Sequence, residues 1–188
     1  MDLWIWITIG VVVIIAFMFA GTYNGLVRTR NQVKNAWAQI DVQLKRRYDL
    51  VPNLVETVKG YARHERETFE MVTQARNLAQ QFTSAGAGER AKVEGELSSA
   101  LGRLLAVAEA YPDLKANQNF LALQEELTST ENKIGFARQF YNDSVLRLNN
   151  KTQEFPSNIV ASITGFKPAE YFETTLETER QAPKVSFS

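Results

Sequence analysis

Residues 33–58 read VKNAWAQIDVQLKRRYDLVPNLVETV, and the spacing of their apolar side chains decides the fold class. Three or four residues separate each apolar position from the next. These positions are Val33, Trp37, Ile40, Leu44, Tyr48, Val51, Val55 and Val58. A helix brings such positions onto one face, near the 3.5-residue repeat of coiled coils. The pattern predicts a long amphipathic helix with Trp37 on its buried face.

Pro52 lies inside this stripe of apolar residues. Proline lacks a backbone donor and clashes with the preceding turn, so we expect a kink or a break near Leu50. The stripe continues in phase beyond Pro52 to Phe82, which favours a kink over a reversal of the chain. The predicted helical blocks are residues 24–50 and 53–83.

Toward the N-terminus, residues 3–21 contain no charge, and at about 28 Å they would match the hydrocarbon thickness of a bilayer. The segment begins with Leu3 and ends with Gly21. Trp4, Trp6 and Tyr23 occupy the ends, where an aromatic belt would lie. A cleaved signal peptide would have Lys or Arg before its apolar run, and none precedes this one. We therefore expect a transmembrane anchor over residues 1–23.

The flanking charges predict the orientation of this anchor. Arg28, Arg30 and Lys34 follow the apolar run, whereas no basic residue precedes it. Cytoplasmic flanks of membrane spans carry the excess of Lys and Arg. We expect the N-terminus outside and the body in the cytoplasm, at the inner (cytoplasmic) membrane.

The second half of the chain repeats the helical pattern. Residues 83–88 read TSAGAG, which is typical of a turn. Apolar stripes follow over residues 89–110 and 114–150, separated by a break at Pro112, and Asn149-Asn150 would end the last helix. No strand pattern occurs before residue 155. The expected fold is all-α, an antiparallel bundle of three or four long helices over residues 24–154.

The C-terminal part changes character. Residues 155–173 suit a short amphipathic helix, ended by Gly165, and a loop. Residues 174–188 begin as a polar linker and end in an extended tail, in which Val185 and Phe187 alternate with serines. Two roles for that tail remain open, a disordered terminus or a segment that pairs with another subunit.

Composition excludes several classes of function. Lys and Arg together number 21, as do Asp and Glu, so the chain lacks the basic excess of a nucleic-acid-binding protein. Cysteine is absent and His64 is the only histidine, which argues against thiol chemistry and two-histidine metal sites. We expect no enzyme activity, no metal and no cofactor, and we interpret His64 as a surface or partly buried structural residue.

Lys45, Arg46 and Arg47 form a compact basic triplet. One interpretation is contact with anionic lipid or with a partner protein. The other is a solvated helix face paired with Asp41 and Asp49. Both interpretations remain open from the sequence.

Several runs stand in a characteristic order along the chain: residues 36–37, 40–47, 49–55, 58–62, 111–116, 119–120, 130–132 and 155–156. Together they resemble the bacterial LemA family, from the anchor to Tyr171-Phe172. The resemblance implies one membrane span carrying a bundle of long helices, without established catalytic residues. It also implies an association with HtpX-type membrane metalloproteases in envelope quality control.

These observations lead to two hypotheses of function. The first is a membrane-anchored, non-enzymatic scaffold that forms homo-oligomers. The second is a regulatory adaptor of a membrane protease. If the two arms are antiparallel, Pro52 and Pro112 would lie at similar heights, which predicts either a weak plane across the bundle or a mere adjustment of helix curvature.

Overall fold

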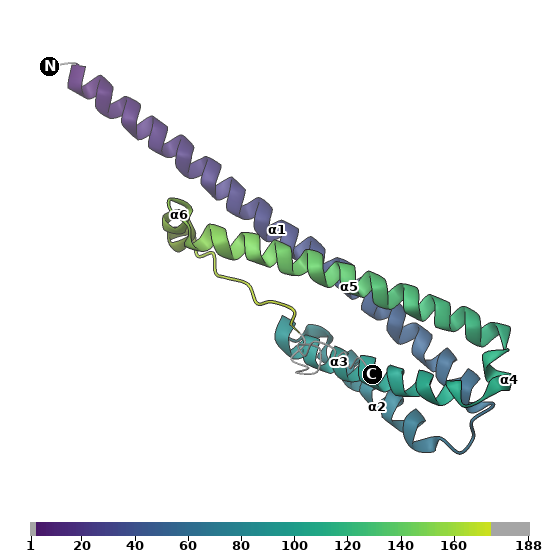
Figure 1. Ribbon diagram of the computed structural model, residues 1–188. Helices are drawn as coiled ribbons and strands as arrows, with labels where there is room; N and C mark the ends of the chain where they lie inside the picture. The colour runs from purple at the N-terminus through teal and green to yellow at the C-terminus, as the bar shows by residue number, and fades with distance from the viewer. Residues whose placement is uncertain (1–2, 174–188) are drawn as a thin grey trace, which may run out of the picture. The chain divides into compact units, whose positions relative to one another are not determined.

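The computed structural model describes residues 3–173, and every regular element in that part of the chain is helical (Figure 1). In chain order they are α1 (Leu3–Lys59), α2 (Arg66–Gln81), the 3-10 helix η1 (Phe82–Ser84), α3 (Ala87–Glu109), α4 (Pro112–Lys115), α5 (Gln118–Gln153) and α6 (Ser157–Thr164). The prediction of an all-α chain with a long apolar N-terminal helix is confirmed. Val185 and Phe187 lie outside the described residues.

Contacts between residues divide the chain into two compact units. Of the described residues, unit 1 comprises 3–39 and 137–169, which contribute the first part of α1, the last part of α5, and α6. Unit 2 comprises residues 40–136 and 170–173, with the remainder of α1 and α5 together with α2, η1, α3 and α4. The two longest helices therefore contribute to both units.

The predicted apolar stripes form the core. Ile40, Leu44 and Val58 of α1 are completely buried, as are Leu97 and Leu104 of α3. Burial continues along α5 at the predicted positions Leu127, Ile134, Ala137, Tyr141, Val145 and Leu148. Each fully buried Leu or Ile side chain contributes about 1.5–3 kcal/mol by leaving water. The spacing of apolar residues thus identified the packed faces correctly.

Pro52 does not break the first helix. It lies inside α1, which continues to Lys59, and its side chain faces solvent. The helix ends instead at Lys59, and α2 begins at Arg66 rather than at the predicted residue 53. Because Pro52 is on the solvent-exposed face, it disturbs only its own helix. Packing of the neighbouring apolar residues stabilises α1 on both sides of the proline.

The other predicted break, at Pro112, is confirmed because α3 ends at Glu109 and Pro112 occupies the first turn of α4. In unit 2 this connection lies beside the one that follows α1 (Figure 1). The Asn117 amide donates to the Tyr61 hydroxyl at 2.9 Å. The two interruptions of the arms are therefore the turns at one end of unit 2, and the expectation of a weak plane through Pro52 and Pro112 was wrong.

Two glycines at the start of α3 make room for the C-terminal segment. A Cβ atom at Gly86 would lie 2.9 Å from Glu170 Oε2, and one at Gly88 would lie 2.6 Å from Glu170 Oε1. The Glu170 carboxylate thus approaches the N-terminus of α3, where the helix dipole favours a negative charge. The glycines of the TSAGAG turn serve this approach as well as the turn itself.

In unit 1 the end of α5 holds the segment that follows α6. The Asn149 side chain accepts a hydrogen bond from Ala169 N at 2.8 Å and donates one to Ala169 O at 3.0 Å. Asn149 was predicted to end its helix, but α5 continues to Gln153. The prediction that Gly165 ends α6 is confirmed, because Gly165 adopts a left-handed conformation with φ 74°.

Candidate functional site

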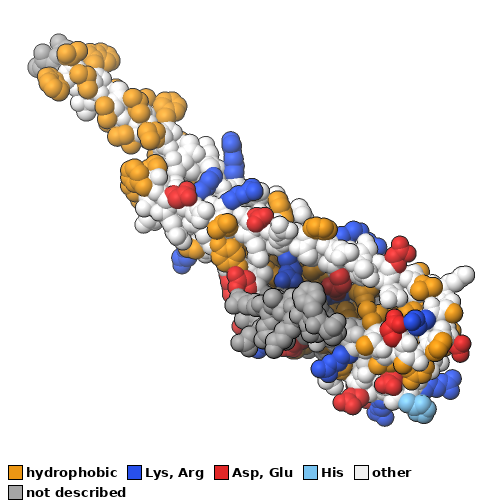
Figure 2. Space-filling view, viewed as in Figure 1, with side chains coloured by type: hydrophobic (Ala, Val, Ile, Leu, Met, Phe, Trp, Pro, Cys, Tyr) orange, Lys and Arg blue, Asp and Glu red, His pale blue; other side chains and the backbone are white. Residues whose placement is uncertain are grey.

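The apolar start of α1 has no protein around it. Trp4 is 80% exposed, Trp6 70% and Phe17 76%, and α1 is long and apolar enough to cross a membrane. Figure 2 shows this end of the molecule covered with hydrophobic side chains. The hydroxyl of Thr8, the one polar side chain of the run, donates to Trp4 O at 2.8 Å. The backbone groups within an α-helix bond to one another, which is the main requirement for burial in lipid.

The basic triplet does not form one surface. Lys45 and Arg46 are exposed, but Arg47 is only 1% exposed. Arg46 lies 3.7 Å from the Glu126 carboxylate in an exposed ion pair. The interpretation of Arg47 as a lipid or partner contact was therefore wrong, because its helix turns it into the core of unit 2.

Arg47 is the centre of a buried polar cluster that joins three helices of unit 2. Its guanidinium forms an ion pair with Glu94 of α3 and donates to Ser98 Oγ at 2.8 Å. It also lies 2.9 Å from Glu131 Oε1 of α5. The Tyr48 hydroxyl donates to the second Glu94 oxygen. A buried carboxylate with two such partners fixes the register of α1 against α3.

Arg90 extends the same cluster toward the start of α3. Its side chain is 1% exposed and pairs with the half-exposed Asp41 of α1. Its guanidinium also donates to Thr83 O at 3.3 Å, and its Nε lies 4.0 Å from Glu94. Two buried cations thus share the single buried Glu94, and two partly exposed carboxylates complete the charge balance.

The cluster holds its charges firmly. Burial by itself lowers the pKa of Arg47, but the carboxylates of Glu131 and Glu94 outweigh burial and raise that pKa above its ordinary value. Burial, followed by the hydrogen bond to Glu94, raises the pKa of Tyr48 above its ordinary value of 10.0. Arg47 therefore remains cationic and Tyr48 neutral at physiological pH. The arrangement supports a structural role for these groups.

A second polar contact explains how α1 tolerates Pro52. The proline has no N–H to donate to the carbonyl of Tyr48, four residues earlier. Arg76 of α2 donates its Nε–H to this Tyr48 oxygen at 2.8 Å. The freed carbonyl thereby becomes the point at which α2 attaches to α1.

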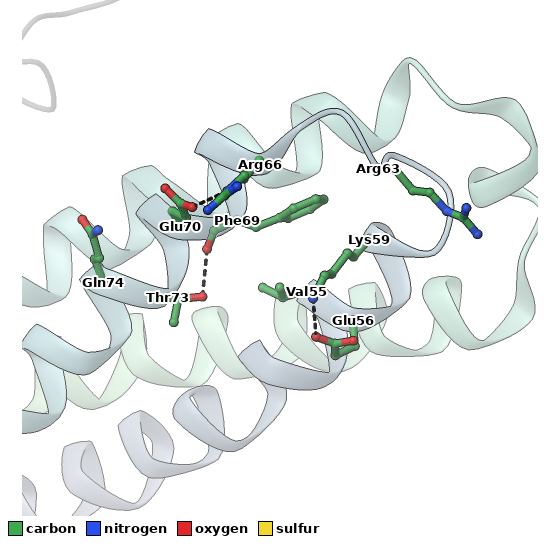
Figure 3. Close-up of a pocket in the computed structure, with 9 residues that line it drawn as sticks. All are labelled: Val55, Glu56, Lys59, Arg63, Arg66, Phe69, Glu70, Thr73 and Gln74. Carbon is green, nitrogen blue, oxygen red and sulfur yellow. Dashed lines mark hydrogen bonds and ion pairs between the residues drawn. The ribbon is translucent and has the colours of Figure 1, made fainter.

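A groove in unit 2 lies between the end of α1 and the start of α2 (Figure 3). Val55 and Phe69 provide its apolar floor. Its rim contains two exposed ion pairs, Lys59 with Glu56 at 3.3 Å and Arg66 with Glu70 at 2.7 Å. Exposed pairs of this kind contribute little stability.

His64 lies in the connection between α1 and α2 and is exposed. Within residues 3–173, no three His, Asp or Glu side chains gather in a way that could hold a metal ion. The interpretation of His64 as a surface residue agrees with its position.

Comparison with known proteins gives the chain a family. The model of the LemA family matches residues 36–187. The chain belongs to the LemA family. Protein LemA of Metamycoplasma hominis is 31% identical over 157 residues, which cover 82% of this chain and 69% of that protein.

Other relatives of this LemA-family chain are named for the magnetosome. Magnetosome protein MamQ 2 of Paramagnetospirillum magneticum is 27% identical over 175 residues, 80% of this chain and 64% of that protein. Magnetosome protein MamQ of Magnetospirillum gryphiswaldense is 25% identical over 174 residues, with the same coverage of 80% and 64%. The chain thus spans just under two thirds of both magnetosome proteins. None of these names states an enzymatic activity.

Sequence reasoning missed the buried residues Arg90 and Glu94 and the partly buried Arg76, although a signal for the first two was present. Glu94 lies three residues before Leu97, and Arg90 lies four residues before Glu94, so charged residues continue the apolar stripe of α3. A charge at a core position requires a buried partner. Arg76 had no such signal, because its partner is a backbone oxygen.

Proposed function

We propose that this LemA-family chain is a single-pass membrane protein in which α1 carries an antiparallel helical bundle, and that it acts as a non-enzymatic scaffold that self-associates. One observation carries the proposal. The exposed apolar residues 3–21 and the core-forming residues from Val33 to Val58 belong to one uninterrupted helix. Such a helix joins a membrane anchor to the body without an intervening linker.

The charges that follow the apolar run support a body in the cytoplasm at the inner membrane. Arg28, Arg30 and Lys34 lie within about 20 Å of the end of the run at 1.5 Å per residue. Basic residues at this distance are retained on the cytoplasmic side during insertion. The N-terminus would then lie outside.

The interior of unit 2 supports a structural rather than a catalytic role. Its buried ionisable groups have ionic partners, Glu94 for Arg47 and the half-exposed Asp41 for Arg90. A general acid or base must instead reach a substrate. These groups hold helices in register, which is what a scaffold requires.

Exposed apolar side chains on α5 support self-association. Phe136 is 73% exposed and Leu121 is 49% exposed, and 15 residues of helix place them about 60° apart around the axis. Between them lies a shallow polar surface that includes Thr128 and Asn132. We propose that these two apolar side chains contact another copy of the chain.

The alternative from the family resemblance is an adaptor for a membrane metalloprotease. Lys45 and Arg46 would be the exposed basic contacts of such an adaptor with an acidic partner surface. The two proposals differ in composition of the particle, because a scaffold assembles from copies of itself and an adaptor does not.

The experiment is the mass of the particle extracted in mild detergent, corrected for bound detergent. The scaffold proposal predicts a multiple of 21.3 kDa, reduced by Phe136→Ser with Leu121→Ser. Lys45→Ser with Arg46→Ser, at exposed positions of α1, is the matched control and should leave the mass unchanged. A particle of one chain would contradict self-association, and a particle of one chain with a bound protease would support the adaptor.

A further inference from the structure

The short helix α6 has two apolar faces, and only one of them is packed. Val160 and Ala161 are buried. Ile159 is 51% exposed and Ile163 is 70% exposed, and their spacing of four residues places them about 40° apart on the opposite side. Phe155, a further four residues earlier, is 80% exposed. Neighbouring exposed apolar side chains of this size are typical of a surface that contacts a protein or a membrane.

The packed face of α6 fixes this helix to α1 just beyond the apolar run. Leu26 of α1 is completely buried against Val160 and Ala161. The Tyr23 ring meets the edge of the Phe166 ring, with 6.1 Å between centroids. Leu26 is five residues past Gly21, which corresponds to about 7.5 Å along the helix.

That distance determines what faces the exposed side of α6. If residues 3–21 cross the hydrocarbon, the next 5–8 Å or so of α1 pass through the polar headgroup layer. Since α6 packs on Leu26, it lies at this depth, directly beside the span. Figure 2 shows hydrophobic side chains gathered over α6, near the point where the apolar end of α1 begins.

Cationic side chains surround the same level of unit 1. The Arg30 guanidinium lies 4.9 Å from the centre of the Phe166 ring, and Lys151 Nζ donates to Gly25 O at 3.3 Å. Arg28 of α1 and the exposed Lys167 after α6 add two further positive charges, and the acidic residue nearest to α6 in sequence is Glu154. An apolar face beside Lys and Arg is the arrangement by which interfacial helices bind anionic membranes.

We propose that α6 is a second membrane contact, a helix lying in the lipid interface with Phe155, Ile159 and Ile163 inserted beside the α1 anchor. The inference rests on the proposed function in one respect, that α1 spans the bilayer. Its consequence is orientation. A single helix can rotate and tilt in a bilayer, whereas a second insertion point on one side of the helix fixes which face of unit 1 is turned toward the membrane.

The test uses the absence of cysteine from the chain, which allows single probes to be placed. The variants Ile159→Cys and Ile163→Cys of the full chain carry an environment-sensitive fluorophore. Val12→Cys reports on the anchor, and Ser99→Cys, at an exposed position of α3, is the control for unit 2. Each protein is reconstituted in phosphatidylethanolamine–phosphatidylglycerol vesicles with a nitroxide either near the headgroup or deep in the acyl chain.

We expect the probes at positions 159 and 163 to be quenched roughly twofold more by the shallow nitroxide than by the deep one, as for a helix 5–10 Å into the interface. The probe at position 12 should show the reverse order, and the probe at position 99 should be quenched by neither. If position 12 is quenched but positions 159 and 163 are not, the inference about α6 is overturned while the anchor stands. If position 12 is also unquenched, the proposed anchor itself fails. A blue-shifted but unquenched probe on α6 would indicate a protein contact and would also overturn the inference.

Discussion

Removal of the Arg76 side chain should destabilise the protein only while Pro52 is present. Arg76 Nε lies 2.8 Å from the Tyr48 oxygen that the proline leaves without its helical donor. A hydrogen bond from a charged group contributes about 1.5–3 kcal/mol, and Arg76→Met removes it while retaining much of the aliphatic length. We therefore expect Arg76→Met to lower the free energy of unfolding by about 2 kcal/mol.

The variant Pro52→Ala provides the complementary half of a double-mutant cycle. Its new N–H can donate to the Tyr48 carbonyl, and alanine in a helix interior is favoured over proline by up to about 3 kcal/mol. In this background Arg76→Met should lower the free energy of unfolding by less than about 1 kcal/mol, since the carbonyl retains a donor. The coupling between the two positions should therefore be about 1 kcal/mol or more.

The assay is urea unfolding of the four proteins in the same mild detergent, followed by far-ultraviolet circular dichroism. Arg103→Met, on the exposed face of α3, is the matched control for loss of a guanidinium and should change stability little. Equal costs of Arg76→Met in the parent chain and in the Pro52→Ala variant would refute the reasoning, because Arg76 would then stabilise α2 independently of the proline.

The remaining predictions concern the buried cluster and the first stripe. Glu94→Gln should lower the free energy of unfolding by about 3–5 kcal/mol, whereas Glu131→Gln, at a side chain 35% exposed, should cost about 1 kcal/mol or less in the same denaturation assay. Because the pKa of Tyr48 is raised in the folded state, its contribution to the free energy of unfolding is complete below pH 10 and is lost as the pH rises further. Tyr48→Phe should therefore reduce the loss of stability at alkaline pH, whereas Tyr61→Phe should not. Trp37→Ala should cost about 2 kcal/mol, since the half-buried ring packs on a neighbouring tyrosine with 5.1 Å between centroids; an unchanged urea midpoint would contradict this.

The helices were predictable wherever apolar residues repeat at three and four positions, because burial of one face is the main source of helix stability. Ile40, Leu104 and Val145 all lie in the core, as their spacing predicted. The errors came from local signals. Pro52 indicated a kink or a break, with separate helical blocks on its two sides, and Asn149 indicated a helix end, yet both lie inside helices.

At both positions the helix is stabilised by a contact with a residue that is distant in sequence. Arg76 donates a hydrogen bond to the Tyr48 carbonyl that Pro52 leaves free, 28 residues earlier in the sequence. The backbone of Ala169 forms two hydrogen bonds with the Asn149 side chain, 20 residues earlier. Local pattern cannot show such compensation. The same limit applies to Arg47, whose place in a row of basic residues suggested a surface until its contacts with Glu94 and Glu131 were seen.

The central claim is that α1 spans the inner membrane and holds the body in the cytoplasm, and single cysteines test it most directly because the chain has none of its own. The variants Asp2→Cys and Val42→Cys, the latter at a side chain 63% exposed, are treated in sealed spheroplasts with a membrane-impermeant maleimide. We expect the Asp2→Cys protein to react at once and the Val42→Cys protein to react only after lysis. Reaction of the Val42→Cys protein in sealed spheroplasts would contradict the claim.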